Sequence, residues 1–158
     1  MNDYVDRGVP KPICLTRSIA ERLLVITRKN HEERCALLFG RLGAKTVLFD
    51  SIAEAENILH SSTRFEIEPE LVWREIIEKE KQYGESLAIG IFHTHPTGSF
   101  NPSQTDRRFM RNWDVPWLIG TRDRKPAIRA YFLWKNQIHE IPIQFLAIEW
   151  TQEMFIES

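Results

Sequence analysis

Apolar and polar residues follow one another along this chain in patterns that predict both strands and helices. The run from Leu87 to Phe92 is apolar throughout, which is typical of a strand buried on both faces. Further apolar segments bounded by turn formers predict strands at residues 13–15, 35–42, 46–53, 64–67, 117–120, 128–134 and 137–143. Gly43-Ala44 and Lys135-Asn136 each separate two of these strands, so both pairs of residues predict hairpin turns.

Three segments carry the start and stop signals of helices. The first is predicted from Ser18, with Glu21 completing a capping box, to about residue 29. The second begins at Pro69 and ends at Gly84. The third begins at Asn101-Pro102, as N-cap and first helical residue. The remaining segments are a loose lead-in at residues 1–16, a surface loop at 54–63, and a tail at 144–158 that the pattern leaves open between helix and strand.

The order of these elements predicts the fold class. One helix, two strands, a helix, a strand, a helix and three strands form a single α/β sandwich around a curved, mostly antiparallel sheet. The length of 158 residues suits one domain, and the chain has no repeats or linkers. We therefore expect one domain over residues 1–158, with its core between about residues 13 and 143.

Composition narrows the range of partners. The formal net charge is −1, which argues against nucleic acid as a partner, because a basic excess would be expected there. The two cysteines, Cys14 and Cys35, are too few for a disulfide framework. No apolar run approaches the roughly 20 residues that span a bilayer, and no signal-peptide pattern is present. These features predict a soluble, cytoplasmic protein with no membrane partner.

The residues with the most chemical content follow the strand at 87–92. His93 and His95 are two residues apart, so in an extended strand both imidazoles point to the same face. Ser103 and Asp106 are three residues apart near a helix start and share one helix face. Two neutral imidazoles and a carboxylate are a common ligand set for catalytic zinc, with the fourth position left for water. The stretch predicts a hydrolytic zinc centre with His93, His95 and Asp106 as ligands.

This set of residues resembles the JAMM motif of the MPN+ metalloproteases, with His93, His95, Pro96, Ser103 and Asp106 at the spacing of that family. The family carries its catalytic glutamate upstream, in a stretch similar to Glu33-Arg34-Cys35-Ala36-Leu37-Leu38-Phe39-Gly40. Ala36 departs from the family, which often has Gly there. The resemblance extends through residues 64–69 and covers about residues 18–143. It implies the MPN fold, which is cytidine-deaminase-like, and Glu33 as the general base, with Glu32 as the alternative.

The resemblance also implies an activity. A single Zn²⁺ with a bound water would be the cofactor, Glu33 would move the proton, and Ser103 would donate a hydrogen bond to the oxyanion. The expected reaction is hydrolysis of the isopeptide bond between the glycine tail of a ubiquitin-like or SAMP-type modifier and a lysine. Two alternatives are a peptidase that trims the carboxyl terminus of a sulfur-carrier protein and a non-catalytic MPN scaffold. Conjugates of these modifiers are the expected partners, and both a monomer and a homodimer remain open.

Other chemistries find less support in the sequence. The H-E-x-x-H helix of other zinc peptidases is absent, as is the Pro-Cys-x-x-Cys of zinc deaminases. Cys35 lies among apolar neighbours that predict burial, which disfavours it as a nucleophile. We interpret His31, His60 and His139 as ordinary structural or surface residues.

Overall fold

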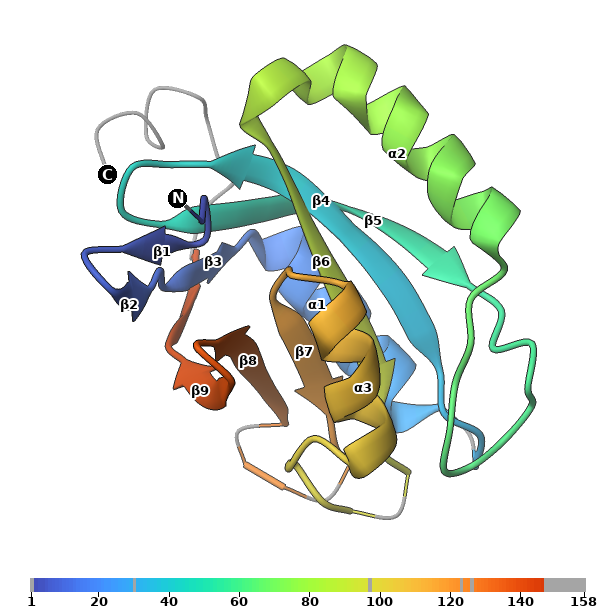
Figure 1. Ribbon diagram of the computed structural model, residues 1–158. Helices are drawn as coiled ribbons and strands as arrows, with labels where there is room; N and C mark the ends of the chain where they lie inside the picture. The colour runs from blue at the N-terminus through green and yellow to red at the C-terminus, as the bar shows by residue number, and fades with distance from the viewer. Residues whose placement is uncertain (1, 30, 97, 123, 126, 147–158) are drawn as a thin grey trace.

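A computed structural model describes residues 2–29, 31–96, 98–122, 124–125 and 127–146 (Figure 1). In chain order the elements are β1 (Val5–Asp6), β2 (Val9–Pro10), β3 (Ile13–Leu15), α1 (Arg17–Arg28), β4 (Cys35–Leu42), β5 (Val47–Ala55), α2 (Pro69–Tyr83), the short 3₁₀ helix Gly84–Ser86, β6 (Leu87–Thr94), α3 (Gln104–Asn112), β7 (Trp117–Gly120), β8 (Ile128–Trp134), β9 (Gln137–Ile141) and β10 (Ile143–Phe145).

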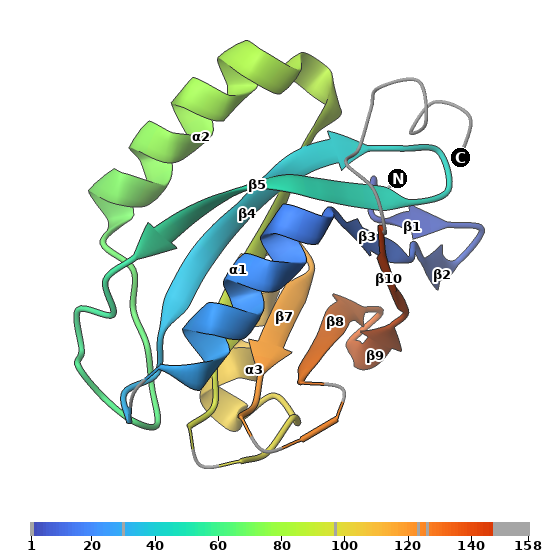
Figure 2. The same ribbon diagram turned by 180° about the vertical axis from the view of Figure 1, so that it is seen from behind.

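Helices cover both faces of one curved sheet. Figure 1 shows α2 and α3 on the near side of the strands, and Figure 2 shows α1 on the opposite side. Buried residues divide in the same way, since one cluster contains the inner face of α1 and another contains apolar residues of α2 and α3. The predicted α/β sandwich is confirmed.

The main sheet has the strand order β10-β3-β5-β4-β6-β7-β8-β9. The pairs β4/β5, β4/β6, β7/β8 and β8/β9 are antiparallel, whereas β10/β3, β3/β5 and β6/β7 are parallel. Helix α3 makes the crossover between the parallel neighbours β6 and β7. The carboxyl end of β6 therefore opens into the start of α3, and residues that follow this strand meet residues of that helix.

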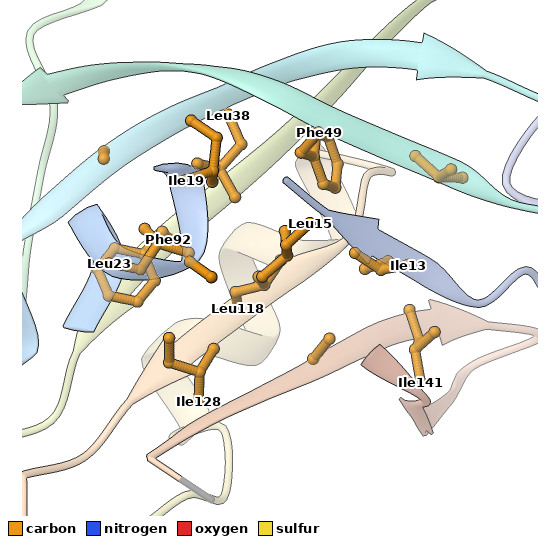
Figure 3. Packing of buried hydrophobic residues seen from close by; sticks show 14 of the residues in the cluster. Ile13, Leu15, Ile19, Leu23, Leu38, Phe49, Phe92, Leu118, Ile128 and Ile141 are labelled. Atoms are coloured by element: carbon orange, nitrogen blue, oxygen red, sulfur yellow. The ribbon is translucent and has the colours of Figure 1, made fainter. Parts of the chain in front are cut away.

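Core packing fixes which way the side chains of β6 point. Phe92 is fully buried in the cluster with Leu15 and Leu23, on the side of the sheet that α1 covers (Figure 3). Burying such a side chain contributes about 1.5–3 kcal/mol. Because successive side chains alternate between faces, Ile91 and His93 point to the opposite face, where α2 and α3 pack. The hydrophobic core thus directs His93 toward α3.

Several predicted elements need correction. Residues 64–67 do not form a strand, because their backbone is held by loop contacts such as Ile58 N to Glu66 O at 3.0 Å. The strand predicted at 137–143 is divided by Pro142, which has no N–H to donate to the ladder. Its last part is β10, which pairs with β3 instead. The lead-in is more ordered than predicted, since β1 and β2 form a hairpin too short to leave a periodic pattern.

The start of α1 also differs from the prediction. Thr16 is the N-cap, and its hydroxyl accepts a hydrogen bond from the N–H of Ile19. Ser18 lies inside the helix, and Glu21 pairs with Arg17 rather than closing a capping box. The predicted N-cap at Ser18 is therefore wrong, and residue type alone could not reveal this, because Thr and Ser are both favoured N-caps.

Other expectations hold. Helix α2 begins at Pro69 and is followed by Gly84 with φ 61°, as predicted. Lys135 and Asn136 both have positive φ, as a two-residue type I′ hairpin turn requires. The open question about the tail is answered only through Phe145 in β10, since residues 147–158 lie outside the described part. Within the described residues, no helix is long and apolar enough to cross a membrane.

Gly40 provides a test of how closely β4 and β5 approach one another. The register of the pair shifts between Phe39 and Gly40, and a Cβ on Gly40 would lie 1.8 Å from the carbonyl oxygen of Leu48. We expect Gly40→Ala to lower the free energy of unfolding by at least about 1–3 kcal/mol, the usual cost of overpacking. Denaturant unfolding measures this directly.

The control is Gly8→Ala, whose new Cβ meets no atom within 4 Å. This substitution should cost only about 1–2 kcal/mol, from placing a side chain at positive φ. A wild-type unfolding midpoint for Gly40→Ala would contradict the close contact between the strands.

Candidate metal centre and active site

The two histidines emerge from the end of β6 as neighbours. His93 is the penultimate residue of the strand and is completely buried. His95 follows the strand and extends its ladder, because its N–H donates to the carbonyl of Gly120 at 2.9 Å. The Nε2 atoms of the two rings lie 3.0 Å apart. The extended backbone therefore places both imidazoles on one face, as their spacing predicted.

Asp106 reaches the histidines from the first turn of α3. Ser103 is the N-cap of this helix, and its hydroxyl accepts from the N–H of Asp106 at 3.0 Å. In return, the carboxylate of Asp106 accepts from the N–H of Ser103 at 2.8 Å, which completes a capping box. The prediction that Asn101 is the N-cap and Pro102 the first helical residue is wrong, because both precede the cap.

Three potential ligand atoms form a compact triangle. Asp106 Oδ2 lies 3.2 Å from His93 Nε2 and 3.1 Å from His95 Nε2, and the two Nε2 atoms complete the triangle at 3.0 Å. A tetrahedral ion with bonds of about 2.0–2.1 Å holds its ligand atoms roughly 3.4 Å apart. The triangle is thus close to the size that such an ion requires, and its members are the donor types that zinc accepts.

Glu33 lies at the edge of this triangle. Its side chain is 2% exposed, and its Oε1 is 3.9 Å from His93 Nε2. Together with His93 and His95 it also forms a group that could hold a metal, with the ligand atoms within 4.8 Å of one another. Oε1 is buried without a hydrogen-bond partner among the described residues, which leaves it able to accept a proton in the site. Glu32, the alternative, is exposed and contacts His60.

Burial and the close contacts set the charge of each group. Burial raises the pKa of Glu33 to about 7, and the charge of Asp106 adds to this effect while His95 opposes it. Burial also lowers the pKa of His93 below its ordinary value, despite the opposing effect of Asp106. For Asp106, burial acts to raise the pKa, but hydrogen bonds with His93 and His95 hold it well below the ordinary value. The site thus combines an ionised Asp106 with a carboxyl group at Glu33 that gains and loses a proton near neutrality.

The tautomer of His95 follows from its second ring nitrogen. Nδ1 lies 2.5 Å from the carbonyl oxygen of Ser99, which can only accept, so Nδ1 must carry the proton. Burial acts to lower the pKa of His95, but its hydrogen bonds with Asp106 and Ser99 raise it above the ordinary value. When the ring is neutral, the lone pair is on Nε2, which faces the triangle. Such a hydrogen bond on the outer nitrogen is typical of metal-bound histidines.

Aromatic rings enclose the inner side of His93. Phe65 stacks on its imidazole with ring centroids 4.5 Å apart, and Trp117 meets it edge-on at 5.9 Å. An open cleft of about 400 Å³ reaches the site, and its lining residues are Glu33, Ser62, Thr63, His95, Ser99, Asn101, Pro102 and Ser103. Ser103 therefore faces the cleft as well as capping α3. The hydroxyl oxygen accepts from Asp106 N–H, so its proton is available to donate into the cleft.

The structure brings all five predicted residues together: Glu33, His93, His95, Ser103 and Asp106. Sequence reasoning missed the carbonyl of Ser99 and the side chain of Asn57, which donates to the carbonyl of Glu33 at 2.9 Å. Neither carries a recognisable signal, since one acts through its backbone and the other is a single asparagine in an irregular loop. Cys35 is buried, and burial together with the charge of Glu33 raises its pKa to about 12. A thiol with this pKa is not an activated nucleophile.

Comparison with known proteins agrees with this picture. A solution structure of protein DSY2949 from Desulfitobacterium hafniense superposes with a TM-score of 0.72 over 89% of this chain and 96% of that one, at 22% identity. The two proteins therefore share a fold. The chain also matches the family described as prokaryotic homologs of the JAB domain over residues 17–134.

The chain belongs to this prokaryotic JAB-domain family, and the resemblance to the JAMM/MPN+ family is confirmed. A curated relative, named Desampylase, comes from Pyrococcus furiosus. It is 33% identical over 122 residues, which are 77% of this chain and 81% of the relative.

Because Glu33 is buried, we expect the free energy of unfolding of the metal-free protein to depend on pH. Its pKa of about 7 in the fold exceeds the value of about 4.3 expected in an unfolded chain. The folded state then binds the proton of Glu33 more tightly than the unfolded state does. The contribution of this carboxyl group to the free energy of unfolding is therefore present at low pH and is lost as the pH rises through 7. We expect Glu33→Gln to melt at a higher temperature than wild type at about pH 8, with a smaller difference at about pH 5.

Both proteins would be measured by thermal melting in the presence of a chelator. Glu32→Gln serves as the control for removing a neighbouring carboxylate, because that side chain is exposed and lies outside the site. If the melting temperatures of Glu33→Gln and wild type differed by the same amount at the two pH values, this would contradict a buried Glu33 that titrates.

Proposed function

We propose that this protein is a zinc-dependent isopeptidase that releases a ubiquitin-like modifier from lysine side chains. The observation that carries the proposal is the triangle of His93, His95 and Asp106 with Glu33 beside it, open to a cleft. Membership of the JAB-domain family and the relative named Desampylase support a deconjugating hydrolase. A SAMP-type protein with a glycine tail is the proposed modifier, because the relative's name points to this class of substrate.

The ligand assignment follows from distance and charge. Asp106 Oδ2 is within 3.2 Å of both imidazoles, whereas Glu33 Oε1 is 3.9 Å from His93. The pKa of Asp106 is held low, so it is a carboxylate at any physiological pH, whereas Glu33 takes up a proton near pH 7. We assign Asp106 as the third ligand and Glu33 as the general base. A bound zinc ion would supply Lewis acidity, polarising the scissile carbonyl and acidifying a water molecule.

Each side chain has a separate task in the proposed reaction. Glu33 Oε1 accepts the proton of the attacking water and then passes it to the leaving lysine amine. A base with a pKa near the working pH can perform both transfers. Ser103 Oγ donates a hydrogen bond to the carbonyl oxygen as negative charge develops on it. Phe65 and Trp117 close the inner side of His93, which keeps bulk water away from that ligand.

The cleft sets the path of the substrate tail. An extended glycine tail would lie along the cleft beside Ser62 and Thr63, with its carboxyl end at His95 and Glu33. Glycine residues suit such a path because they have no side chain to accommodate. Residues 64–67 form no strand that the tail could extend. The loop that precedes them is the proposed contact.

The direct test is cleavage of a purified conjugate. A ubiquitin-like modifier ending in Gly-Gly would be joined to a substrate lysine and, separately, fused in line to a reporter. We expect the wild-type protein to release the lysine-linked modifier and to stop when a chelator removes the metal. Cleavage of the linear fusion alone would favour the trimming peptidase, and binding of both without cleavage would favour the scaffold.

Two variants separate metal binding from proton transfer. His95→Ala should lose zinc, because an incomplete ligand set remains. Glu33→Gln should keep zinc and its fold but lose turnover by at least about 100-fold, as removal of a general base does. Metal content would be measured for each purified protein, with Glu32→Gln as the matched control expected to keep both zinc and activity. Full zinc occupancy in His95→Ala would overturn the ligand assignment.

Ser103→Ala tests the second function of the N-cap residue. We expect kcat to fall by roughly 10²–10³ with KM little changed, because an oxyanion donor acts mainly in the transition state. The loss of the cap should also cost about 1 kcal/mol of stability, measured by denaturant unfolding. Ser103→Thr keeps a hydroxyl and should restore most of both properties. A Ser103→Ala variant that is destabilised but has wild-type kcat would leave Ser103 as a cap alone.

A further inference from the structure

The loop between β5 and α2 is organised around one buried asparagine. Asn57 is 6% exposed, and both ends of its side-chain amide are hydrogen-bonded. Nδ2 donates to the carbonyl of Glu33 at 2.9 Å and to the carbonyl of Arg64 at 3.0 Å. Oδ1 accepts from the N–H of Leu59 and the N–H of Glu66, each at 3.1 Å. The side chain thus ties residues 59, 64 and 66 of the loop to the backbone of Glu33.

One of these contacts reaches the proposed general base. Glu33 precedes β4, so its backbone lies outside the sheet that fixes its neighbours. Two loop contacts hold it instead: its N–H donates to the carbonyl of Ser61 at 2.8 Å, and its carbonyl accepts from Asn57. The carboxylate oxygen Oε1 has no hydrogen-bond partner among the described residues. The backbone contacts therefore decide where this oxygen lies.

The same loop also touches a proposed metal ligand. Phe65 lies between Arg64 and Glu66, the two residues whose backbone groups Asn57 binds, and it stacks on His93. Asn57 therefore joins the segment that carries the base to the segment that packs on the ligand ring. Glu33 and Asn57 are 24 residues apart in the chain, so this connection exists only in the fold.

We propose that Asn57 is a positioning residue that holds Glu33 at its working distance from His93 and His95 through its hydrogen bond to the Glu33 carbonyl. This inference rests on the proposed function, because it assigns Asn57 a role in proton transfer. Catalytic groups need placement within roughly 0.5 Å, and a displacement of about 1 Å can cost about 100-fold in rate. Because Oε1 of this base has no hydrogen-bond partner among the described residues, its placement depends on the backbone.

The amide group is chemically suited to this role. An asparagine side chain both donates and accepts, and here it donates to the carbonyls of Glu33 and Arg64, with a longer contact of 3.4 Å to that of Ser61, and accepts from two N–H groups. Aspartate has the same shape but no donor, so its second oxygen would face these carbonyl oxygens in a buried place. Asn57→Asp therefore keeps the accepted bonds of the loop and removes all the donated bonds, including the one to Glu33.

The experiment compares Asn57→Ala and Asn57→Asp with wild type in the zinc-loaded protein. We expect kcat toward the lysine-linked conjugate to fall by roughly 10–100-fold in both variants, as loss of a supporting hydrogen bond typically causes. Zinc affinity, measured by competition with a chelator, should stay within about twofold, because the proposed ligands lie on β6, just beyond it and on α3. Asn57→Asp carries the test if Asn57→Ala does not fold.

A double-substitution cycle separates positioning from general destabilisation. If Asn57 acts through Glu33, adding Asn57→Asp to Glu33→Gln should cause little further loss of kcat, because the base it positions is already gone. If the loss of kcat in the double variant equals the product of the losses in the two single variants, the inference is overturned. The control is Asn2→Ala, which removes an asparagine that also donates and accepts, to Asp114 and from Tyr4, far from the site. It should leave kcat unchanged.

Amide hydrogen exchange provides a readout that needs no activity. In Asn57→Asp the N–H of Glu33 should exchange faster, because the segment it belongs to is released, while the N–H of His95 should stay protected. Unchanged kcat in an active enzyme, or unchanged exchange at Glu33, would overturn the inference. A wild-type protein that cleaves no conjugate would overturn the proposed function instead, and the exchange result would still decide whether Asn57 holds Glu33.

Discussion

The carboxylate of Asp106 connects the fold of this protein to its chemistry. One oxygen accepts from the backbone of Ser103, which caps α3, and the same oxygen faces both imidazoles at the end of β6. A helix start and a strand end are therefore held together at one point, and the crossover from β6 to β7 passes through it. Because the pKa of Asp106 is held well below its ordinary value, the carboxylate stays ionised near neutral pH.

This arrangement places several polar groups in a buried position, where each has an energetic cost unless it is paired. His93 and Asp106 compensate one another, but Glu33 is left with a buried carboxyl oxygen that has no partner in the described part of the chain. Its pKa rises to about 7 as a result. The same burial that destabilises the charged form makes Glu33 a suitable proton acceptor near neutral pH. Function and stability are in opposition at this residue.

Much of the fold was predictable because its signals are local. The apolar run before His93, the Pro69 and Gly84 limits of α2 and the Lys135-Asn136 turn each depend on neighbours in sequence, and the structure confirms them. The gathering of His93, His95, Ser103 and Asp106 followed from motif spacing, and Glu33 from the resemblance to the JAMM family. The predictions of secondary structure failed where contacts between residues distant in sequence decide the local structure. Residues 64–67 look like a strand, but they form an irregular loop in which the side chain of Asn57 binds the carbonyl of Arg64 and the N–H of Glu66.

The caps show the same limit. Residue type alone does not separate Thr16 from Ser18, or Asn101 from Ser103, because all of these are favoured N-cap types, and the structure has Thr16 and Ser103. For α3 that choice has a functional result, because Ser103 as the cap brings its hydroxyl to the cleft and turns Asp106 toward the histidines. No local pattern reveals that Asn57 supports Glu33, since that contact spans 24 residues.

The central claim is that His93, His95 and Asp106 bind zinc while Glu33 stays outside the coordination sphere. X-ray absorption at the zinc edge of the purified protein, followed by a crystal structure with anomalous scattering from zinc, tests it most directly. The account predicts two imidazole nitrogens and one carboxylate oxygen at about 2.0–2.2 Å, with an oxygen of solvent in the fourth position. Coordination by Glu33 in place of Asp106, or binding of zinc at another part of the chain, would contradict it.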